Sequence, residues 1–531
     1  MSRVNSAMQY RRLRSPKDHG GRLIDPPLSD VQSQLSANLD PARRGDCDLQ
    51  GRSLASLSGT ARSLLLDAAI EYTSVYRDVP GSLSLAGTPI VMTGHQPDLY
   101  HAGVWYKNFV LDQIARKRQA VGINLLIDND TIGKATIRVP SGTVDSPLVE
   151  QVAFDQARNE IPFEERRLMD PELLNSFAER VRSKLFRSIN SPLVEQLWPN
   201  VVTASISSQN LGSCLSQARH QLEASWGLKT LELPLSQVCD ADPFRWFAAT
   251  LLTRLQQFQQ IHNELLLEYR RANRVRSQTH PVPPLAADGE WLEAPFWLWS
   301  ATDPRRRRLF VRQVRDGIEI TDRQAQRHLL SLTSDGSCEV GVEQLRQLSD
   351  QGIKLRSRAL LTTMFARLFL CDLFIHGIGG AKYDQLTDAI IQRFFGFTAP
   401  KFVTVTATAK LPIEHPVVAD TEILATQLKL RELRFNPQRY LVSLPEAASL
   451  VTAKQKLITT EVQFDSRQNR HLQIAQLNDA MQPMVEQQRM KLLHERANLI
   501  EQARIGTLLG SREYSFCLFP EATLRPLLLD I

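Results

Sequence analysis

The chain has 531 residues, of which 43% are hydrophobic and 23% are charged, a composition typical of globular proteins with two to four domains. It contains no run of eighteen apolar residues, so we expect no membrane-spanning helix and no membrane partner. Its first residues lack the apolar core of a secretory signal, which predicts a cytoplasmic location.

The net charge of +6 is concentrated at one end of the chain. Residues 1–22 hold six arginines or lysines and one aspartate, so the rest of the chain is almost neutral. A nucleic-acid-binding domain normally has a strongly basic face, and this distribution therefore argues against a nucleic-acid partner. We expect residues 1–30 to form a disordered basic tail. The six cysteines are scattered without a CxxC pair, which predicts neither a zinc site nor a disulfide framework.

The densest group of polar residues follows an apolar stretch at residues 90–92. Residues 93–97 read Thr-Gly-His-Gln-Pro, and a helix-compatible segment begins near residue 104. This pattern predicts a strand, a turn and a helix. In open α/β sheets such a junction borders the crevice in which ligands bind. His95, Gln96 and His101 are therefore candidate site residues.

A second apolar stretch, residues 122–127, ends in Asp128-Asn129-Asp130 and predicts a neighbouring parallel strand. Both polar groups would then lie at the same edge of the sheet, where carboxylates can act as a base or hold an amine. The alternative is that the two aspartates cap a turn and that His95 hydrogen-bonds locally. His95, His101 and either aspartate could surround a divalent ion, but no metal-binding spacing is present and we predict no metal site.

A glycine-rich turn follows a third apolar stretch, residues 371–375. Gly377, Gly379 and Gly380 precede a predicted helix that starts at Tyr383 and extends to residue 395. Such a turn can bring backbone close to a ligand, although tight packing alone can also require glycine.

Both elements resemble the bacillithiol-synthesis cysteine ligase family (BshC-like). The first element resembles the family's opening motif through Thr93, Gly94, Gln96, Leu99, Tyr100, Gly103, Tyr106 and Lys107. The second resembles its later glycine-rich element through Gly377, Gly379, Tyr383, Gln385 and Leu386. The clear similarity covers about a fifth of the chain.

This resemblance implies a ligase that adds cysteine to a sugar-derived acceptor in low-molecular-weight thiol synthesis. In that mechanism the turn at residues 93–96 and Lys107 orient an anionic or carbonyl oxygen. Asp128 or Asp130 holds the amine of the amino acid, and His95 moves a proton. The turn at residues 377–380 closes the other side of the pocket. Whether ATP or ADP takes part stays open.

His95-Gln96-Pro97, a nearby glycine, a lysine and an acidic strand end are also similar to the start of WbqC-like proteins, which are associated with surface-glycan gene clusters. This second resemblance implies a protein that binds a nucleotide sugar. A noncatalytic ligand-binding or scaffold protein is the third alternative.

Residues 141–354 form a predicted α+β insertion with a hairpin of aromatic and basic character. Residues 291–299 and 309–314 are the predicted strands, and residues 305–308, four arginines, are the predicted turn. We expect this turn to face solvent. The alternative is that its arginines, with Trp297 or Trp299, contact an anionic or sugar-like substrate. His262, on an amphipathic helix of the insertion, is expected to be a satisfied interior histidine.

Residues 413–531 have a helical pattern, interrupted by Pro483, where we expect a kink or a break. The pattern resembles an antiparallel helical hairpin, and a homodimer joined through coiled-coil contacts of this arm is expected from the ligase resemblance. Packing onto the chain's own core is the alternative. We therefore predict an α/β fold with a Rossmann-like parallel-sheet core, formed by residues 31–140 and 355–412, split by the insertion and followed by the arm.

Overall fold

The computed structural model describes residues 13–40, 47–79, 87–157, 161–333, 336–460 and 467–531. The chain divides into two compact units. The larger unit comprises Met1–Val139, Glu150–Leu411 and Arg512–Ile531, and the smaller unit comprises Pro140–Val149 and Pro412–Ser511. Within the described ranges, no helix combines the length and the apolar content that crossing a bilayer requires.

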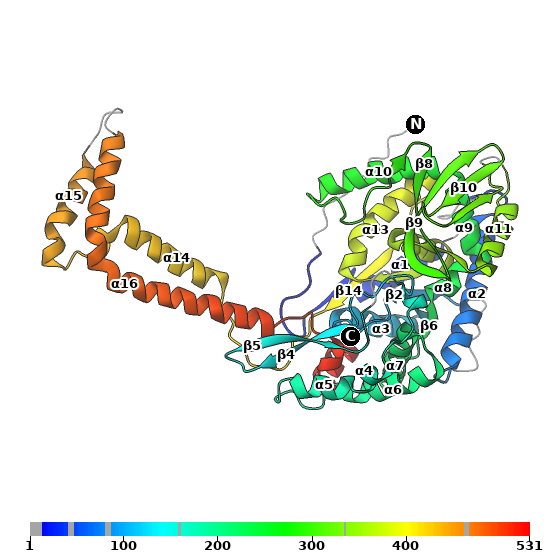
Figure 1. The fold of residues 1–531 in the computed structure, drawn as a ribbon, viewed down its shortest axis with the longest axis horizontal. Helices are drawn as coiled ribbons and strands as arrows, with labels where there is room; N and C mark the ends of the chain where they lie inside the picture. The colour runs from blue at the N-terminus through cyan, green and yellow to red at the C-terminus, as the bar shows by residue number, and fades with distance from the viewer. Residues whose placement is uncertain (1–12, 41–46, 80–86, 158–160, 334–335, 461–466) are drawn as a thin grey trace. The chain divides into compact units, whose positions relative to one another are not determined.

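The larger unit is built around a six-stranded sheet (Figure 1). The strands, in their order across the sheet, are β1 (Arg22–Asp25), β14 (Phe402–Ala407), β13 (Leu373–His376), β2 (Ile90–His95), β3 (Val121–Leu126) and β6 (Leu231–Pro234). All neighbours are parallel except β1, which runs antiparallel to β14. Helices account for 53% of the described residues, and with the parallel sheet this confirms the predicted α/β class.

The order of the strands reverses between β2 and β13. From β2 the chain proceeds outward through β3 to β6, whereas from β13 it proceeds the other way to β14. Helix α3 (Ala102–Lys117) links β2 to β3, and helix α13 (Ile378–Ile390) with a π-helical turn links β13 to β14. In such sheets the two diverging connections leave a crevice at the carboxyl ends of the central strands.

The two faces of the sheet have different chemistry because successive side chains of a strand point to opposite sides. On one face, Ile90, Met92, Ile123 and Leu125 join a large apolar core with α2 (Leu54–Ser74) and α9 (Asp242–Thr253). On the other face, α3 packs beside β2, β3, β13 and β14. Polar groups of β3 and β6 lie on this second face and are described below.

The predicted insertion contains a second, antiparallel sheet. Its strands are β8 (Trp291–Ser300), β9 (Asp303–Val314), β10 (Gly317–Thr321), β11 (Arg327–Leu330) and β12 (Ile353–Ser357), with β7 (Ala287–Asp288) beside β8. Helices α10 (Leu255–Ala272) and α11 (Glu339–Asp350) pack against it.

The remaining helices of the larger unit are α1 (Val31–Leu39), α4 (Pro171–Asn175), α5 (Phe177–Lys184), α6 (Val194–Ser207), α7 (Leu211–Ser225), α8 (Leu235–Cys239), α12 (Ala359–Phe365) and α17 (Glu521–Leu529). Of these, α7 lies behind the polar face of the sheet, and α12 precedes β13.

The smaller unit consists of α14 (Asp420–Phe435), α15 (Ala448–Thr459), the long α16 (Arg467–Leu509) and the tip of the hairpin β4 (Thr136–Gly142) and β5 (Pro147–Ala153). Its core is formed by Leu433, Leu441, Ala447, Met481, Val485 and Leu492. The helix α16 continues through Pro483 instead of ending there. Figure 1 draws a bend in α16, which is the expected effect of a proline that removes a backbone hydrogen bond.

Three parts of the chain differ from the predicted boundaries. Arg22–Asp25 lies in the predicted tail but forms the edge strand β1, whose Leu23 and Ile24 pair with β14; residues 1–12 lie outside the described residues. Leu231–Pro234 lies in the predicted insertion but completes the parallel sheet beside β3. The four arginines at 305–308 belong to β9 and not to a turn, because β8 and β9 pair up to Ser300 and Asp303.

Candidate functional site

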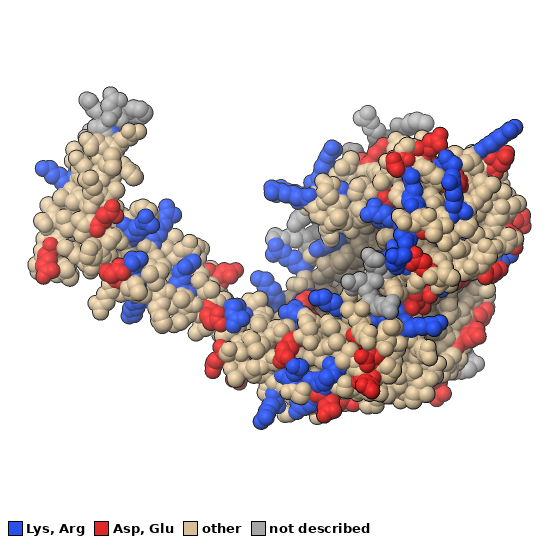
Figure 2. All heavy atoms as spheres, viewed as in Figure 1, with Lys and Arg blue, Asp and Glu red and all other residues tan. Residues whose placement is uncertain are grey.

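A cleft of about 1040 Å³ opens at the carboxyl ends of β2 and β13. Its walls come from the ends of these strands, the first turns of α3 and α13, and the β8–β9–β12 region. Figure 2 shows a hollow in the face of the larger unit with lysine and arginine side chains along its edge. This is the position at which a doubly wound sheet binds its ligands.

The wall of the cleft is strongly basic. Among the residues that the structure describes, one carboxylate, Asp130, lines the cleft. Seven basic side chains line it as well: Arg14, Lys17, Lys107, Arg306, Arg358, Lys382 and Arg512. Such a concave, positively charged wall favours a small anionic ligand.

Lys107 is buried at the base of the cleft, between the ends of the two central strands. It lies on the second turn of α3, and its Nζ donates to the carbonyl oxygen of Gly94 at 2.5 Å. On the other side its side chain approaches Gly377, after β13. Burial, together with the positive charge of Arg219, lowers the pKa of Lys107 to about 7. A lysine in this environment exchanges a proton near neutral pH and can serve as a base or as an anion-binding group.

A buried ionic network lies beneath Lys107, on the polar face of the sheet. Arg219 of α7 donates to Glu223 at 2.7 Å and to Glu232 of β6 at 2.5 Å. Glu223 also accepts from Asn108 at 2.7 Å. Burial raises the pKa of Glu232 to about 7, against the effect of Arg219. The network therefore places a guanidinium and two carboxylates, all buried, directly behind the residues at the base of the cleft.

His376 and Asp384 form a pair on the opposite side of the cleft. His376 is the last residue of β13, and its Nε2 lies 2.5 Å from Oδ2 of Asp384 on α13. Asp384 is fully buried and also accepts hydrogen bonds from Thr363 and Arg367, at 2.7 and 2.8 Å. Burial alone would raise the pKa of Asp384. The charges of His376 and Arg367 nevertheless hold this pKa below its ordinary value.

His376 lines the cleft. A buried carboxylate that holds one nitrogen of a cleft-lining imidazole is an arrangement suited to proton transfer. Gly380 is required beside it, because a Cβ at that position would lie 2.6 Å from Nδ1.

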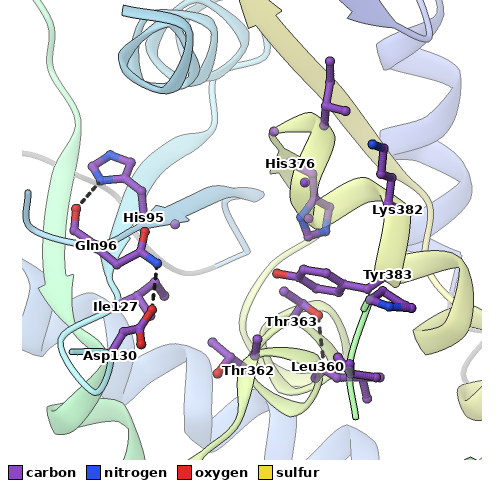
Figure 3. A pocket seen from close by; sticks show the side chains of 18 of the residues that line it. His95, Gln96, Ile127, Asp130, Leu360, Thr362, Thr363, His376, Lys382 and Tyr383 are labelled. Atoms are coloured by element: carbon purple, nitrogen blue, oxygen red, sulfur yellow. Dashed lines mark hydrogen bonds between the residues drawn. The ribbon is translucent and has the colours of Figure 1, made fainter. Parts of the chain in front are cut away.

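Gln96 and Asp130 face His376 and Tyr383 across the cavity (Figure 3). The Nε2 of Gln96 donates to Oδ2 of Asp130 at 2.9 Å, and Arg306 donates to Oδ1 at 2.8 Å. Figure 3 shows the hydroxyl of Tyr383 directed into the space between the two sides. Burial and the negative charge of Asp384 raise the pKa of Tyr383, so its hydroxyl keeps its proton and can donate it in a hydrogen bond.

His95 lines the cleft, but both of its ring nitrogens contact protein atoms. Its Nδ1 lies 3.1 Å from the carbonyl oxygen of Gln96, and its Nε2 lies 2.9 Å from Oδ1 of Asn108. The hydroxyl of Tyr100 is 3.2 Å from the same Nε2. Burial, with Lys107 and Arg219, lowers the pKa of His95 well below its ordinary value. In Figure 3 the ring points away from the opposite wall, so the local hydrogen-bonding alternative describes His95 better than proton transfer.

Three predicted residues do not line the cleft. Asp128 is buried and accepts hydrogen bonds from the backbone and hydroxyl of Ser236, at 2.9 and 2.5 Å, which fixes the start of α8. Thr93 donates to the carbonyl oxygen of Ile375 at 2.8 Å and joins β2 to β13. Tyr106 is buried on α3. Because side chains alternate along a strand and project around a helix, adjacency in sequence does not place all of these groups in one cavity.

The structure brings the other predicted residues together. These are Gly94, His95, Gln96, His101, Lys107, Asp130, Gly377, Gly379, Gly380 and Tyr383. His101 also accepts a hydrogen bond from the backbone of Gly103 at 3.0 Å and caps α3. The expected interior histidine, His262, is buried with Nδ1 3.0 Å from Asn263 Oδ1, although it also lines the cleft.

The sequence interpretation did not single out His376 or Asp384. The available signal was a histidine at the end of an apolar strand, immediately before the glycine turn. Arg306, one of the four arginines expected to face solvent, lines the cleft, and so does Trp297, whose segment, Glu293 to Trp297, was a candidate cleft wall. Arg14 and Lys17 of the predicted tail line it as well.

One group among the described residues has a spacing suited to a metal ion: His220, Glu223 and Glu232, whose ligand atoms lie within 4.8 Å of one another. Arg219 already donates to both carboxylates. Its guanidinium supplies the positive charge that a cation would otherwise bring, so the buried acids are compensated without a metal.

Comparison with models of known protein families finds no match to the chain, and comparison with curated proteins likewise finds none.

Proposed function

We propose that the protein is an enzyme of the cysteine-adding type, which joins cysteine to a sugar-derived acceptor in the synthesis of a low-molecular-weight thiol similar to bacillithiol. The observation that carries this proposal is the basic cleft at the strand reversal, with Lys107 at its base and the His376–Asp384 pair in its wall. The resemblance of the two glycine-containing elements to the BshC-like ligases supports the same assignment, because both elements contribute to this cleft.

The core is assigned as Rossmann-like on the order of its parallel strands. Numbered along the chain, the parallel strands β2, β3, β6, β13 and β14 lie in the spatial order 3-2-1-4-5, which is the order of the doubly wound dinucleotide-binding fold. This assignment supports the placement of the active site between β2 and β13.

The proposed roles follow from charge and position. Asp130, supported by Gln96, holds the ammonium group of cysteine. His376 takes the proton from the attacking amine of the acceptor, and Asp384 stabilises the imidazolium that forms. Lys107 orients the carboxyl oxygen of cysteine at the base of the cleft. His95 keeps the end of β2 in place through Asn108 and Gln96.

Amide formation from a carboxylate and an amine expels one oxygen of the carboxylate, so the carboxylate must first be activated. ATP is the activating substrate that we propose: its γ-phosphoryl group is transferred to the carboxylate with release of ADP, and the amine then displaces inorganic phosphate, which carries the expelled oxygen. Lys382, Arg14 and Lys17 are positive groups of the cleft wall that could contact its phosphates.

The test is an assay of purified protein with cysteine and glucosaminyl malate, with and without ATP, in which the product is identified by mass spectrometry. The ligase proposal predicts a product whose mass equals the sum of both substrates less one water, formed in the presence of ATP. The same incubation with cysteine omitted is the control. If no coupled product forms with any nucleotide present, the ligase assignment fails.

The positive charge of the cleft also favours a second candidate, a WbqC-like protein that binds a nucleotide sugar in a glycan pathway, because a diphosphate is a suitable ligand for these side chains. Calorimetric titration with a uridine diphosphate sugar distinguishes this candidate. Saturable binding of the nucleotide sugar without coupling of cysteine favours it. A noncatalytic binding or scaffold protein is favoured if variants of Lys107 and His376 leave the protein's cellular function intact.

We propose that the protein forms a homodimer through its helical arm. Leu424 and Leu428 lie one turn apart on α14, and 53% and 54% of their surfaces are exposed. Met490 on α16 is 55% exposed. Apolar side chains of this size at regular helical spacing suit contact with a second copy. Light scattering of the purified protein should give twice the chain mass, and Leu424→Glu with Leu428→Glu should give a monomer.

A further inference from the structure

Trp297, Arg306 and Arg358 form a cluster on the wall of the cleft away from the strand ends. The Cζ atom of Arg306 lies 4.4 Å from the centre of the Trp297 ring, and that of Arg358 lies 4.8 Å from it. All three residues line the cleft. An indole in contact with two guanidinium groups fixes their planes and leaves their N–H edges to be satisfied by other groups.

Among the described residues, the guanidinium of Arg358 makes a hydrogen bond through one of its three nitrogens. Its Nη1 donates to Oε1 of Glu293 at 2.7 Å, and the Glu293 side chain is fully buried. The Arg358 side chain is itself only 13% exposed. Within the described ranges, its Nε and Nη2 have no hydrogen-bond acceptor. These two nitrogens form one edge of the guanidinium, which matches a pair of oxygens on a carboxylate or a phosphate.

The local charge around Arg358 is not neutralised. Burial lowers the pKa of Arg358, and the positive charges of Arg308 and Arg306 lower it further, against the effect of Glu293. Arg308 shares the same carboxylate, at 3.4 Å from Glu293 Oε2. A further anion at the open edge of Arg358 would therefore gain favourable interactions with several cations.

Arg306 connects this cluster to the groups at the strand ends. Its Nη1 donates to Oδ1 of Asp130 at 2.8 Å and to the carbonyl oxygen of Asn129 at 3.2 Å. Arg305, its neighbour in β9, differs: it is 57% exposed, pairs with Asp303 at 2.7 Å and does not line the cleft. Arg306 therefore lines the cleft, whereas the neighbouring Arg305 faces solvent.

We propose that Trp297, Arg306 and Arg358 form a subsite that binds an acidic group of the acceptor, a carboxylate or a phosphate, through the open edge of Arg358. The inference rests on the proposed function in taking the ligand to be the acceptor. It adds which side chains of this protein hold an anionic group of the acceptor that is remote from its reacting amine.

The experiment is calorimetric titration of the full chain with succinate and, separately, with inorganic phosphate. The variant pair Arg358→Met with Glu293→Gln removes the guanidinium together with the buried charge that it neutralises, so the buried site stays balanced. The matched control is Arg305→Met, a change of the same type on the same hairpin. Circular dichroism and thermal unfolding establish that each variant keeps its fold.

We expect at least one of the two anions to bind the wild-type protein. The affinity should fall at least about tenfold in the double variant and stay within about twofold in the control. Tighter binding of succinate assigns the subsite to a carboxylate, and tighter binding of phosphate assigns it to a phosphoryl group. Equal affinities of the wild type and a folded double variant, or no binding of either anion by the wild type, would overturn the subsite.

The coupling assay separates this inference from the proposed function. If cysteine is coupled to the acceptor with an unchanged acceptor KM in the double variant, the ligase assignment stands and the subsite fails. If the anion binds through Arg358 but no coupled product forms, the subsite stands and the ligase assignment fails.

Discussion

Nε2 of His376 lies 2.5 Å from Oδ2 of Asp384, and the turn between β13 and α13 makes this contact possible. The histidine ends the strand, the glycine turn reverses the chain, and Asp384 follows on the helix. Gly380 leaves room for the imidazole, since any side chain there would collide with it. Strand, turn and helix together hold a carboxylate against one ring nitrogen of a cleft-lining imidazole.

Replacing Asp384 with asparagine should lower kcat by about 100-fold or more, because the amide keeps the shape but not the charge that stabilises the imidazolium. The acceptor KM should change little, since Asp384 is not in the cleft wall. Steady-state kinetics of the coupling reaction measure both constants. Thr387→Val, which removes a neutral hydrogen bond to the same carboxylate, is the matched control and should retain most of the activity. Wild-type kcat in Asp384→Asn would remove Asp384 from the mechanism.

The pKa of about 7 for Lys107 predicts a pH dependence of anion binding. The pKa is lowered from 10.5, so Lys107 carries its proton below about pH 7 and loses it above. Anion affinity should therefore fall as the pH rises through 7, by up to about tenfold per unit where Lys107 alone controls it. Calorimetric titration with alanine, whose carboxylate represents the group of cysteine that Lys107 is proposed to orient, measures this slope from pH 6 to pH 9.

The variant Lys107→Met tests whether Lys107 causes this pH dependence of anion affinity. It should bind the anion weakly at pH 6 and show little change between pH 6 and pH 9. Lys382→Met, which removes another cleft lysine, should lower the affinity while keeping the slope. A slope of wild-type size in Lys107→Met would mean that another group titrates.

Arg219 should be essential for stability because it compensates two buried carboxylates. Arg219→Met should lower the free energy of unfolding by about 3–5 kcal/mol, which urea denaturation can measure. Adding Glu223→Gln and Glu232→Gln should recover much of this loss, since no buried charge then lacks a partner. Arg393→Met, at an ion pair with Glu264 in which the two side chains are 45% and 49% exposed, should cost less than about 1 kcal/mol. A small effect of Arg219→Met would show that the carboxylates are protonated or solvated.

Lys454 should stabilise the helical arm through hydrogen bonds to three uncharged oxygens. It is 1% exposed, and its Nζ donates to the carbonyl of Phe435, to Gln438 and to Asn478, at 2.7, 2.5 and 2.6 Å. Lys454→Met leaves three acceptors without a donor and should cost about 2–3 kcal/mol. Hydrogen exchange of α14 and α15 in the full chain should accelerate, whereas Lys456→Met, at an exposed position of α15, should leave it unchanged. Equal exchange in both variants would contradict this role.

The first strand, helix and strand of the core could be predicted from sequence because their signals are local. The apolar stretch at 90–92 and the polar residues after it mark the end of β2, and α3 and β3 follow as predicted. The strand β6 could not be recognised, because it has four residues between helical segments and is stabilised by pairing with β3. The edge strand β1 was assigned to the tail because its pairing partner, β14, lies almost 400 residues later.

The site was predicted only where neighbours in sequence are also neighbours in the cleft. Gln96 and Asp130 follow adjacent parallel strands and meet as expected. Asp128, two residues from Asp130, turns to Ser236 instead, which no local pattern reveals. Asp384 lies within a helical stretch where an acidic residue usually faces solvent, and only the folded chain shows it buried against His376.

Coupling by the variant His376→Asn shows whether cysteine is joined to the acceptor in the cleft between β2 and β13. The measurement is the initial rate of product formation, followed by mass spectrometry with cysteine, glucosaminyl malate and ATP, for the wild type, His376→Asn and the exposed arm control His471→Asn. We expect product from the wild type and the control, and a rate at least about 100-fold lower for His376→Asn. Equal rates for all three proteins, or no product from a folded wild-type protein, would contradict it.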